Sequence, residues 1–88
     1  MNNNKENLEN IIKIVNEADP VGLIALGSPL DEYSSQSMEI LSLLEKRKFD
    51  DLFQDIFDIF QKSFGSETYI DINKVKIIKD RVEKEFAK

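Results

Sequence analysis

Apolar residues recur at helical spacing along most of the chain, and polar residues fill the positions between them. In the first stretch, from about Lys5 to Glu17, apolar residues fall at i, i+3, i+4 and i+7, which is the pattern of one helix face. Its members are Leu8, Ile11, Ile12 and Val15. This helix is expected to end at or before Asp19, because the residue that precedes a proline, here Pro20, is pushed out of the helical conformation.

A second helix is predicted to begin near Ser34 or Ser35, whose hydroxyl groups can cap a helix, and to run to about Lys46. Basic residues from Lys46 to Lys48 favour a helix C-terminus at this point through the helix dipole. The apolar positions of this helix are Met38, Ile40, Leu41, Leu43 and Leu44.

The third helix has the clearest pattern. Phe49 and Asp50 fit a hydrophobic staple and an N-cap, and Gly65 is the expected C-cap. Its apolar residues are Leu52, Phe53, Ile56, Phe57, Phe60 and Phe64. A fourth helix is expected to follow a cap at Asp71 or Asn73. Its apolar residues are Val75, Ile78, Val82 and Phe86.

These amphipathic helices, with no long polar linker between them, predict a single all-α domain with a small four-helix bundle-like arrangement. The chain has 88 residues, of which 41% are hydrophobic, and this is enough for one modest core. Residues 1–4 are expected to form a disordered N-terminus, and residues 5–88 are expected to form the helical domain.

Composition argues against several classes of function. The net charge is −5, and a nucleic-acid partner is disfavoured because binding to a polyanion needs clustered cations. The chain has no cysteine and no histidine, so it lacks thiol chemistry, the commonest general base and the commonest metal ligand. We therefore expect no catalytic, cofactor-binding or metal-binding residues and no enzyme activity. No secretory signal or membrane-length apolar run is recognised, so a cytoplasmic location without membrane contact is expected.

The segment "DPVGLIALGSPLDEY", residues 19–33, contains both prolines and two of the three glycines. Asp19 followed by Pro20 is a start signal for a short turn of helix. Gly22 and Gly27 are positions at which the backbone can adopt positive φ. A phosphate-binding loop is disfavoured, because no lysine or arginine occurs between Asp19 and Glu45.

Ser28 raises an alternative of another class, because acyl carrier proteins are also small, acidic and four-helical. Their modified serine lies in an Asp-Ser-Leu turn at the start of the second helix. Here no aspartate precedes Ser28, and Pro29 follows it, so a capping or turn serine is the competing interpretation.

Two groups of acidic residues are the candidate partner-binding positions. One group surrounds the start of the second helix, and the other follows the spacing i, i+4, i+7 on the third helix. Such stripes are often only solvated faces, but they also suit a basic protein partner. Tyr33 is an open case, because its ring can pack in the core or serve as an interface hot spot. The candidate partner-binding residues are Asp31, Glu32, Tyr33, Glu39, Asp51, Asp55 and Asp58.

The stretch "IVNEADPVGLIALGSPLDEY" resembles the YugE-like family of small bacterial proteins of unknown function. The matching residues are Val15, Asn16, Glu17, Asp19, Pro20, Val21, Gly22, Asp31, Glu32 and Tyr33. The later "FDDLFQDIFDIFQKSFG" is similar to the third helix of that family, while Ala18 stands where the family usually has tryptophan. The resemblance implies a small helical domain and no established activity. Similar small proteins occur among the immunity proteins of bacterial toxin systems.

The function expected from the sequence is therefore protein binding by a small acidic domain. The sharpest form of this hypothesis is an immunity protein that neutralises a cognate bacterial toxin by covering its basic surface. The first alternative is a housekeeping structural or regulatory module that acts as a homodimer through apolar surface on the second and third helices. The second is the acyl-carrier-like protein.

Overall fold

The computed structural model describes residues 4–27, 32–47 and 49–86 of the chain. The described residues contain four α-helices and no strand, which confirms the predicted all-α class. The helices are α1 (Asn4–Ala18), α2 (Ser34–Glu45), α3 (Leu52–Phe64) and α4 (Ile72–Phe86). The α1 helix thus begins at Asn4, whereas residues 1–3 of the predicted disordered N-terminus lie outside the described residues.

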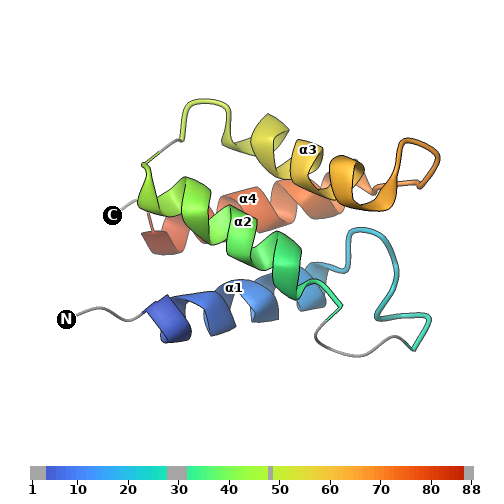
Figure 1. Cartoon of the computed structure of the whole chain (residues 1–88), viewed down its shortest axis with the longest axis horizontal. Coiled ribbons are helices and arrows are strands. Elements are labelled where there is room, and N and C mark those ends of the chain that lie inside the picture. Colours follow the sequence, from blue (N-terminus) through green and yellow to red (C-terminus); the bar gives the residue numbers. More distant parts are fainter. Residues whose placement is uncertain (1–3, 28–31, 48, 87–88) are drawn as a thin grey trace.

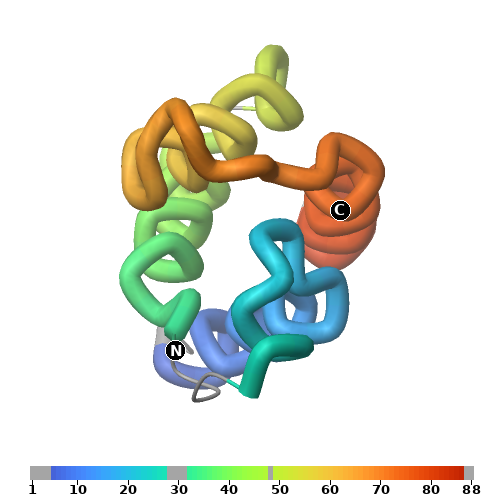
Figure 2. The backbone as a smooth tube through the Cα atoms, turned by 90° about the vertical axis from the view of Figure 1, so that its right-hand side faces the viewer, coloured from blue at the N-terminus to red at the C-terminus, as the bar shows by residue number. Residues whose placement is uncertain are grey.

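Each helix packs against the next one along the chain, and α1 also packs against α4. Figure 1 shows successive helices running in opposite directions, so that α1 begins and α4 ends at the same end of the bundle. In the end-on view of Figure 2, the segment 19–27 crosses the opposite end in front of α1, between α2 and α4. The radius of gyration of 12.2 Å agrees with the value of about 12 Å for a compact chain of this length.

The core lies between the four helices and draws its apolar side chains from all of them. Sequence periodicity identified the core face of α4 correctly, since Val75, Ile78 and Val82 are fully buried. The buried apolar residues are Ile11, Ile14, Val15, Ala18, Tyr33, Ile40, Leu41, Leu44, Leu52, Ile56, Ile59, Phe60, Ile70, Val75, Ile78 and Val82.

The predicted apolar stripes of α1 and α2 supply core residues, among them Ile11, Val15 and Ile40, but not all of their members are buried. On α1, Ile14 and Ala18 are buried, whereas Leu8 and Ile12 are only partly buried, because this helix packs against both α2 and α4. On α2, the side chain of Met38 is 57% exposed, so its predicted place in the stripe is wrong. The neighbouring polar residues Gln36 and Ser37 are buried there instead.

The predicted N-caps of α2 and α3 are also wrong. Tyr33 holds the N-cap position of α2, and Ser34 is already helical. Asp51, one residue later than the predicted Asp50, holds the N-cap position of α3. Neither Tyr33 nor Asp51 makes a side-chain capping hydrogen bond, so packing of the apolar faces stabilises these two helix starts.

Two further helix boundaries follow the sequence. Gly65 ends α3 with φ of 90°, and its N–H donates to the carbonyl oxygen of Gln61 over 2.8 Å. The carboxylate Oδ1 of Asp71 accepts a hydrogen bond of 3.0 Å from the N–H of Asn73, which confirms the predicted cap at the start of α4.

Candidate functional site

The segment 19–27 is organised by the carboxylate of Asp19. Its Oδ1 accepts a hydrogen bond from the N–H of Ile24, and its Oδ2 accepts one from the N–H of Ala25, each 3.0 Å long. An N-cap bonds to residues two or three positions ahead, whereas these amides lie five and six positions ahead. Asp19 therefore closes a wider loop than the predicted helix start. The predicted positive φ is confirmed at Gly22 (83°) and Gly27 (92°).

Tyr33 completes this arrangement from the start of α2. Its hydroxyl donates to Asp19 Oδ1 over 2.7 Å and accepts from the N–H groups of Val21 (3.2 Å) and Leu23 (3.5 Å). Its ring meets the rings of Phe60 and Phe64 edge-on, at centroid distances of 5.9 and 6.0 Å. The side chain is fully buried. Tyr33 is thus a core residue, and its place among the candidate partner-binding residues is wrong.

The pKa values of this pair follow from the same geometry. Burial and the hydrogen bond to Asp19 raise the pKa of Tyr33 to about 12. Partial desolvation would raise the pKa of Asp19, but hydrogen bonds from Tyr33, Ile24 and Ala25 outweigh it and hold that pKa below its usual value. The charge of Lys74 acts in the same direction. At neutral pH the pair is therefore a neutral phenol and a carboxylate.

A backbone hydrogen bond fixes the same loop to the start of α4, where the N–H of Asp71 donates to the carbonyl of Pro20 over 2.9 Å. An ion pair of 2.7 Å between Arg81 and Glu17 also joins α4 to α1. The hydrogen bonds of Asp19 and Tyr33 consequently connect the ends of α1 and α2, while the ring of Tyr33 contacts α3. This cluster stabilises one end of the bundle and presents no reactive group.

Two of the predicted acidic residues meet in a groove between α2 and α3. The groove has a volume of about 330 Å³ and is lined by Glu39, Ser42, Leu43, Asp55 and Ile59. Leu43, which is partly buried, and Ile59, which is buried, are the apolar residues of the lining. We call this feature the α2–α3 groove.

A second pocket, of about 320 Å³, shares Asp55 with the groove and is otherwise lined by Arg47, Asp50 and Asp51. The guanidinium of Arg47 lies 5.2 Å from the centre of the Phe49 ring, and its Nη1 donates to the carbonyl of Phe86 over 3.3 Å. Sequence reasoning missed Arg47 and Asp50 as surface neighbours of Asp55. Their closeness in sequence to Asp51 was the available signal.

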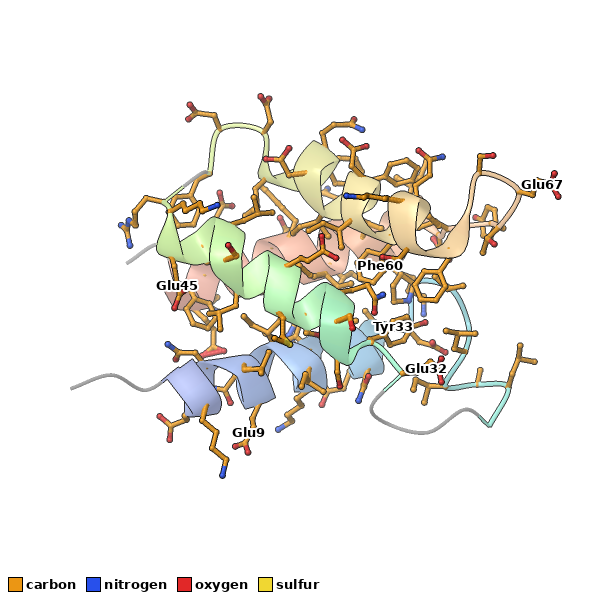
Figure 3. All side chains as sticks on the ribbon, in the orientation of Figure 1. Glu9, Glu32, Tyr33, Glu45, Phe60 and Glu67 are labelled. Atoms are coloured by element: carbon orange, nitrogen blue, oxygen red, sulfur yellow. The ribbon has the colours of Figure 1, made fainter. Side chains whose placement is uncertain are left out.

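The remaining candidates do not join this surface. Asp58 is exposed on α3, and its Oδ1 accepts a hydrogen bond of 2.9 Å from Gln54 Nε2. Glu32 is exposed beside Tyr33, at the start of α2 (Figure 3). Asp31 lies outside the described residues. The structure therefore places Asp55 with Glu39 in the groove and with Asp51 in the second pocket, and it places Asp58 and Glu32 elsewhere.

The carboxylates of the groove differ in ion pairing from those on and beside α4. In the part of the chain that the structure describes, ion pairs join Lys79 to Asp80 (3.7 Å) and Glu83 (2.9 Å), and Arg81 to Glu17 (2.7 Å). No ion pair between described residues involves the acidic groups that line the groove or the second pocket, which are Glu39, Asp50, Asp51 and Asp55. Arg47 already lines the second pocket, whereas no lysine or arginine is among the described residues that line the α2–α3 groove, so the groove is suited to a cationic group from outside the molecule.

Other chemical features are few in the described ranges. No group of three or more acidic side chains there has the arrangement to hold a metal ion. No helix within residues 4–27, 32–47 and 49–86 has the length and apolar character needed to cross a membrane. Ser28, on which the acyl-carrier alternative depends, lies outside the described residues.

Comparison with protein-family models, with curated proteins and with solved structures finds no match to this chain.

Proposed function

We propose that this chain is a small acidic protein-binding domain whose α2–α3 groove binds a basic surface of another protein. The observation that carries the proposal is that two carboxylates, of Glu39 and Asp55, line one groove together with the apolar residues Leu43 and Ile59. An interface of this composition combines burial of apolar area with charge complementarity, which confers specificity and fast, salt-sensitive association.

The specific form of the proposal is an immunity protein that neutralises a toxin by covering a basic active surface. It is supported by the net charge of −5 and by the groove carboxylates, which lack ion-pair partners among the described residues. The resemblance of residues 15–33 to the YugE-like family adds an analogy to small helical bacterial proteins.

The test begins with affinity capture at low salt from the lysate of the source organism. The bait is compared in three forms: the unchanged chain, the Glu39→Lys/Asp55→Lys variant of the groove, and a Glu6→Lys/Glu9→Lys control. The control makes the same change in net charge on exposed positions of α1. Glu9 lies on the side of α1 turned away from α2 and α3 (Figure 3).

The expected result is a protein that the unchanged chain and the control retain and that the groove variant loses. Expressed alone, this protein is expected to arrest growth, and co-expression of the unchanged chain is expected to restore it. Retention of the same protein by the groove variant would exclude the groove as the binding surface. A captured protein with no effect on growth would exclude the immunity role.

The acyl-carrier alternative has a separate test, because it depends on Ser28 and not on the groove. Intact mass would be measured after co-expression with a phosphopantetheinyl transferase. An unmodified chain would end this alternative.

A further inference from the structure

One end of the bundle exposes a group of apolar side chains. Segment 19–27 and the connection between α3 and α4 both lie at this end, which is opposite to the end where α1 begins and α4 ends (Figure 1). Five large apolar side chains are exposed among the described residues, and three of them belong to these two connections or adjoin them. They are Leu26 (83% exposed), Tyr69 (77%) and Ile72 (57%). Single exposed apolar residues are common, whereas a group of them marks an interaction surface.

A pocket of about 270 Å³ lies beside these side chains, between segment 19–27 and the start of α4. Its apolar lining residues are Pro20, Val21, Ala25 and Tyr69, and Leu26 directly follows Ala25 in the chain. An apolar cavity of about 150 Å³ holds a benzene ring, so this pocket has room for a leucine side chain. We call this pocket together with Leu26, Tyr69 and Ile72 the end surface.

Hydrogen bonds fix the end surface in place without a partner. The carboxylate of Asp19 holds the N–H groups of Ile24 and Ala25, directly before Leu26. The bond from the N–H of Asp71 to the carbonyl of Pro20 joins the two connections to each other. A surface that is ordered in advance loses little conformational entropy when it binds.

We infer that a second copy of this chain covers the end surface in a symmetric dimer, with Leu26 of each copy in the end-surface pocket of the other. A two-fold contact requires a surface that is complementary to itself. A projecting leucine next to a pocket with apolar lining meets this requirement, because one contact then fills both pockets. The inference goes beyond the proposed function, since it uses no residue of the α2–α3 groove.

The charged side chains that line the pocket carry both signs, namely Lys74 against Asp19 and Asp71. The carboxylate of Asp19 already accepts hydrogen bonds from its own loop and from Tyr33, and Oδ1 of Asp71 accepts one from the N–H of Asn73. A two-fold contact brings the two pockets together, so Lys74 of one copy faces carboxylates of the other. The pocket therefore does not set a single sign of charge against itself.

The surroundings of the end surface are more acidic than the pocket. Glu67 is exposed on the connection between α3 and α4, and Glu32 is exposed at the start of α2, while Lys62 is exposed in the last turn of α3 (Figure 3). These glutamates and the net charge of −5 oppose a close approach of two copies. Salt screens repulsion between exposed charges. Dimer formation is therefore expected to strengthen with salt, whereas binding of a basic partner in the groove weakens with salt.

The test is sedimentation equilibrium of the purified chain from about 10 μM to about 1 mM, the range in which weak contacts dissociate. It is carried out in NaCl at about 0.01 M and about 1 M, where the Debye lengths are about 30 Å and about 3 Å. Leu26→Gln removes the side chain that enters the pocket. Met38→Gln is the matched control, because Met38 is also an exposed apolar residue but lies on α2. Both changes keep the net charge, and circular dichroism would confirm that both variants keep their helices.

The unchanged chain and Met38→Gln are expected to form dimers and nothing larger, with more dimer at the higher salt concentration. Leu26→Gln is expected to lose at least about tenfold in association constant, because each dimer loses two buried leucine side chains. In a mixture of isotope-labelled and unlabelled copies, nuclear Overhauser contacts are expected between the methyl groups of Leu26 in one copy and Val21 in the other. These contacts report the position of Leu26 directly.

Four results would overturn the inference. They are a chain that stays monomeric at both salt concentrations, association that continues beyond dimers, equal association of Leu26→Gln and Met38→Gln, and association that weakens with salt. A monomeric chain whose partner capture still depends on Glu39 and Asp55 would exclude the dimer and leave the proposed function standing. A dimer that depends on Leu26, in a chain whose groove variant still retains the partner, would exclude the groove and leave this inference standing.

Discussion

Replacing Tyr33 by phenylalanine isolates the hydroxyl group that joins α2 to the loop of residues 19–27. The ring keeps its edge-on contacts with Phe60 and Phe64, because these involve no oxygen. The change removes a hydrogen bond of 2.7 Å to the carboxylate of Asp19 and an acceptor for two backbone N–H groups, at 3.2 and 3.5 Å. The side chain is fully buried, so water does not replace these contacts at the oxygen position.

The loss in free energy of unfolding follows from the type of hydrogen bond that Tyr33→Phe removes. A hydrogen bond to a charged group contributes about 1.5–3 kcal/mol to stability. Asp19 keeps its bonds from the N–H groups of Ile24 and Ala25, so its carboxylate is not left without donors. We therefore expect Tyr33→Phe to lower the free energy of unfolding by about 2 kcal/mol, which corresponds to a fall of about 10 °C in Tm for a domain of this size.

Urea unfolding followed by circular dichroism measures this difference, and an unchanged slope with denaturant would show that the unfolded state is not altered. Tyr69→Phe is the matched control, because Tyr69 is 77% exposed, and it should change stability by less than about 0.5 kcal/mol. A double-mutant cycle with Asp19→Asn tests the coupling directly. Equal midpoints for Tyr33→Phe and Tyr69→Phe, or strictly additive effects in the cycle, would refute the argument.

Four further outcomes are expected. Gly22→Val should destabilise the fold by about 1–3 kcal/mol, because a β-branched residue resists the φ of 83° at this position. A β-carbon there meets no atom within 4 Å, so the loss comes from backbone strain and not from a clash. Asp55→Ala should cost less than about 0.5 kcal/mol in the same urea experiment, and similar midpoints for the two variants would contradict the role of Gly22. In alkaline solution, the raised pKa of Tyr33 predicts stability that is complete below pH 10.0 and lost as the pH rises through about 12. A pH titration of unfolding should show this loss in the unchanged chain and a smaller one in Tyr33→Phe, and identical curves would argue against it. Arg81→Gln should cost at most about 1 kcal/mol, because its ion pair with Glu17 is exposed, and a larger loss in thermal unfolding would mean that this contact is more than a surface pair.

Local sequence alone determined where helices form. A helix is closed by hydrogen bonds between residues four apart, so the spacing of apolar residues and nearby capping groups is enough to place it. The core face of α4 and its cap at Asp71 were predicted for this reason. Gly65 was predicted as a C-cap because positive φ at a helix end is a local property.

Tertiary packing decided which side of each helix is buried and which distant residues meet. Two sets of apolar residues on α1 have the same helical spacing, namely Leu8, Ile11, Ile12 and Val15, and Ile11, Ile14, Val15 and Ala18. Only the packing of α1 against α2 and α4 decided that the second set is the buried one. The hydroxyl of Tyr33 finds Asp19 fourteen residues earlier, so a residue predicted for a partner surface belongs to the core.

The α2–α3 groove also separates what the sequence determines from what tertiary packing decides. The sequence placed Asp55 and Asp58 on one acidic stripe of the third helix, but only Asp55 faces the groove that α2 forms with α3. Glu39 reaches that groove from another helix. Helical spacing is a short-range property of the chain, whereas the sides of a groove are chosen by the packing of helices far apart in sequence. For this reason the sequence alone determined the four helices, and only the tertiary structure decided which carboxylates share a surface.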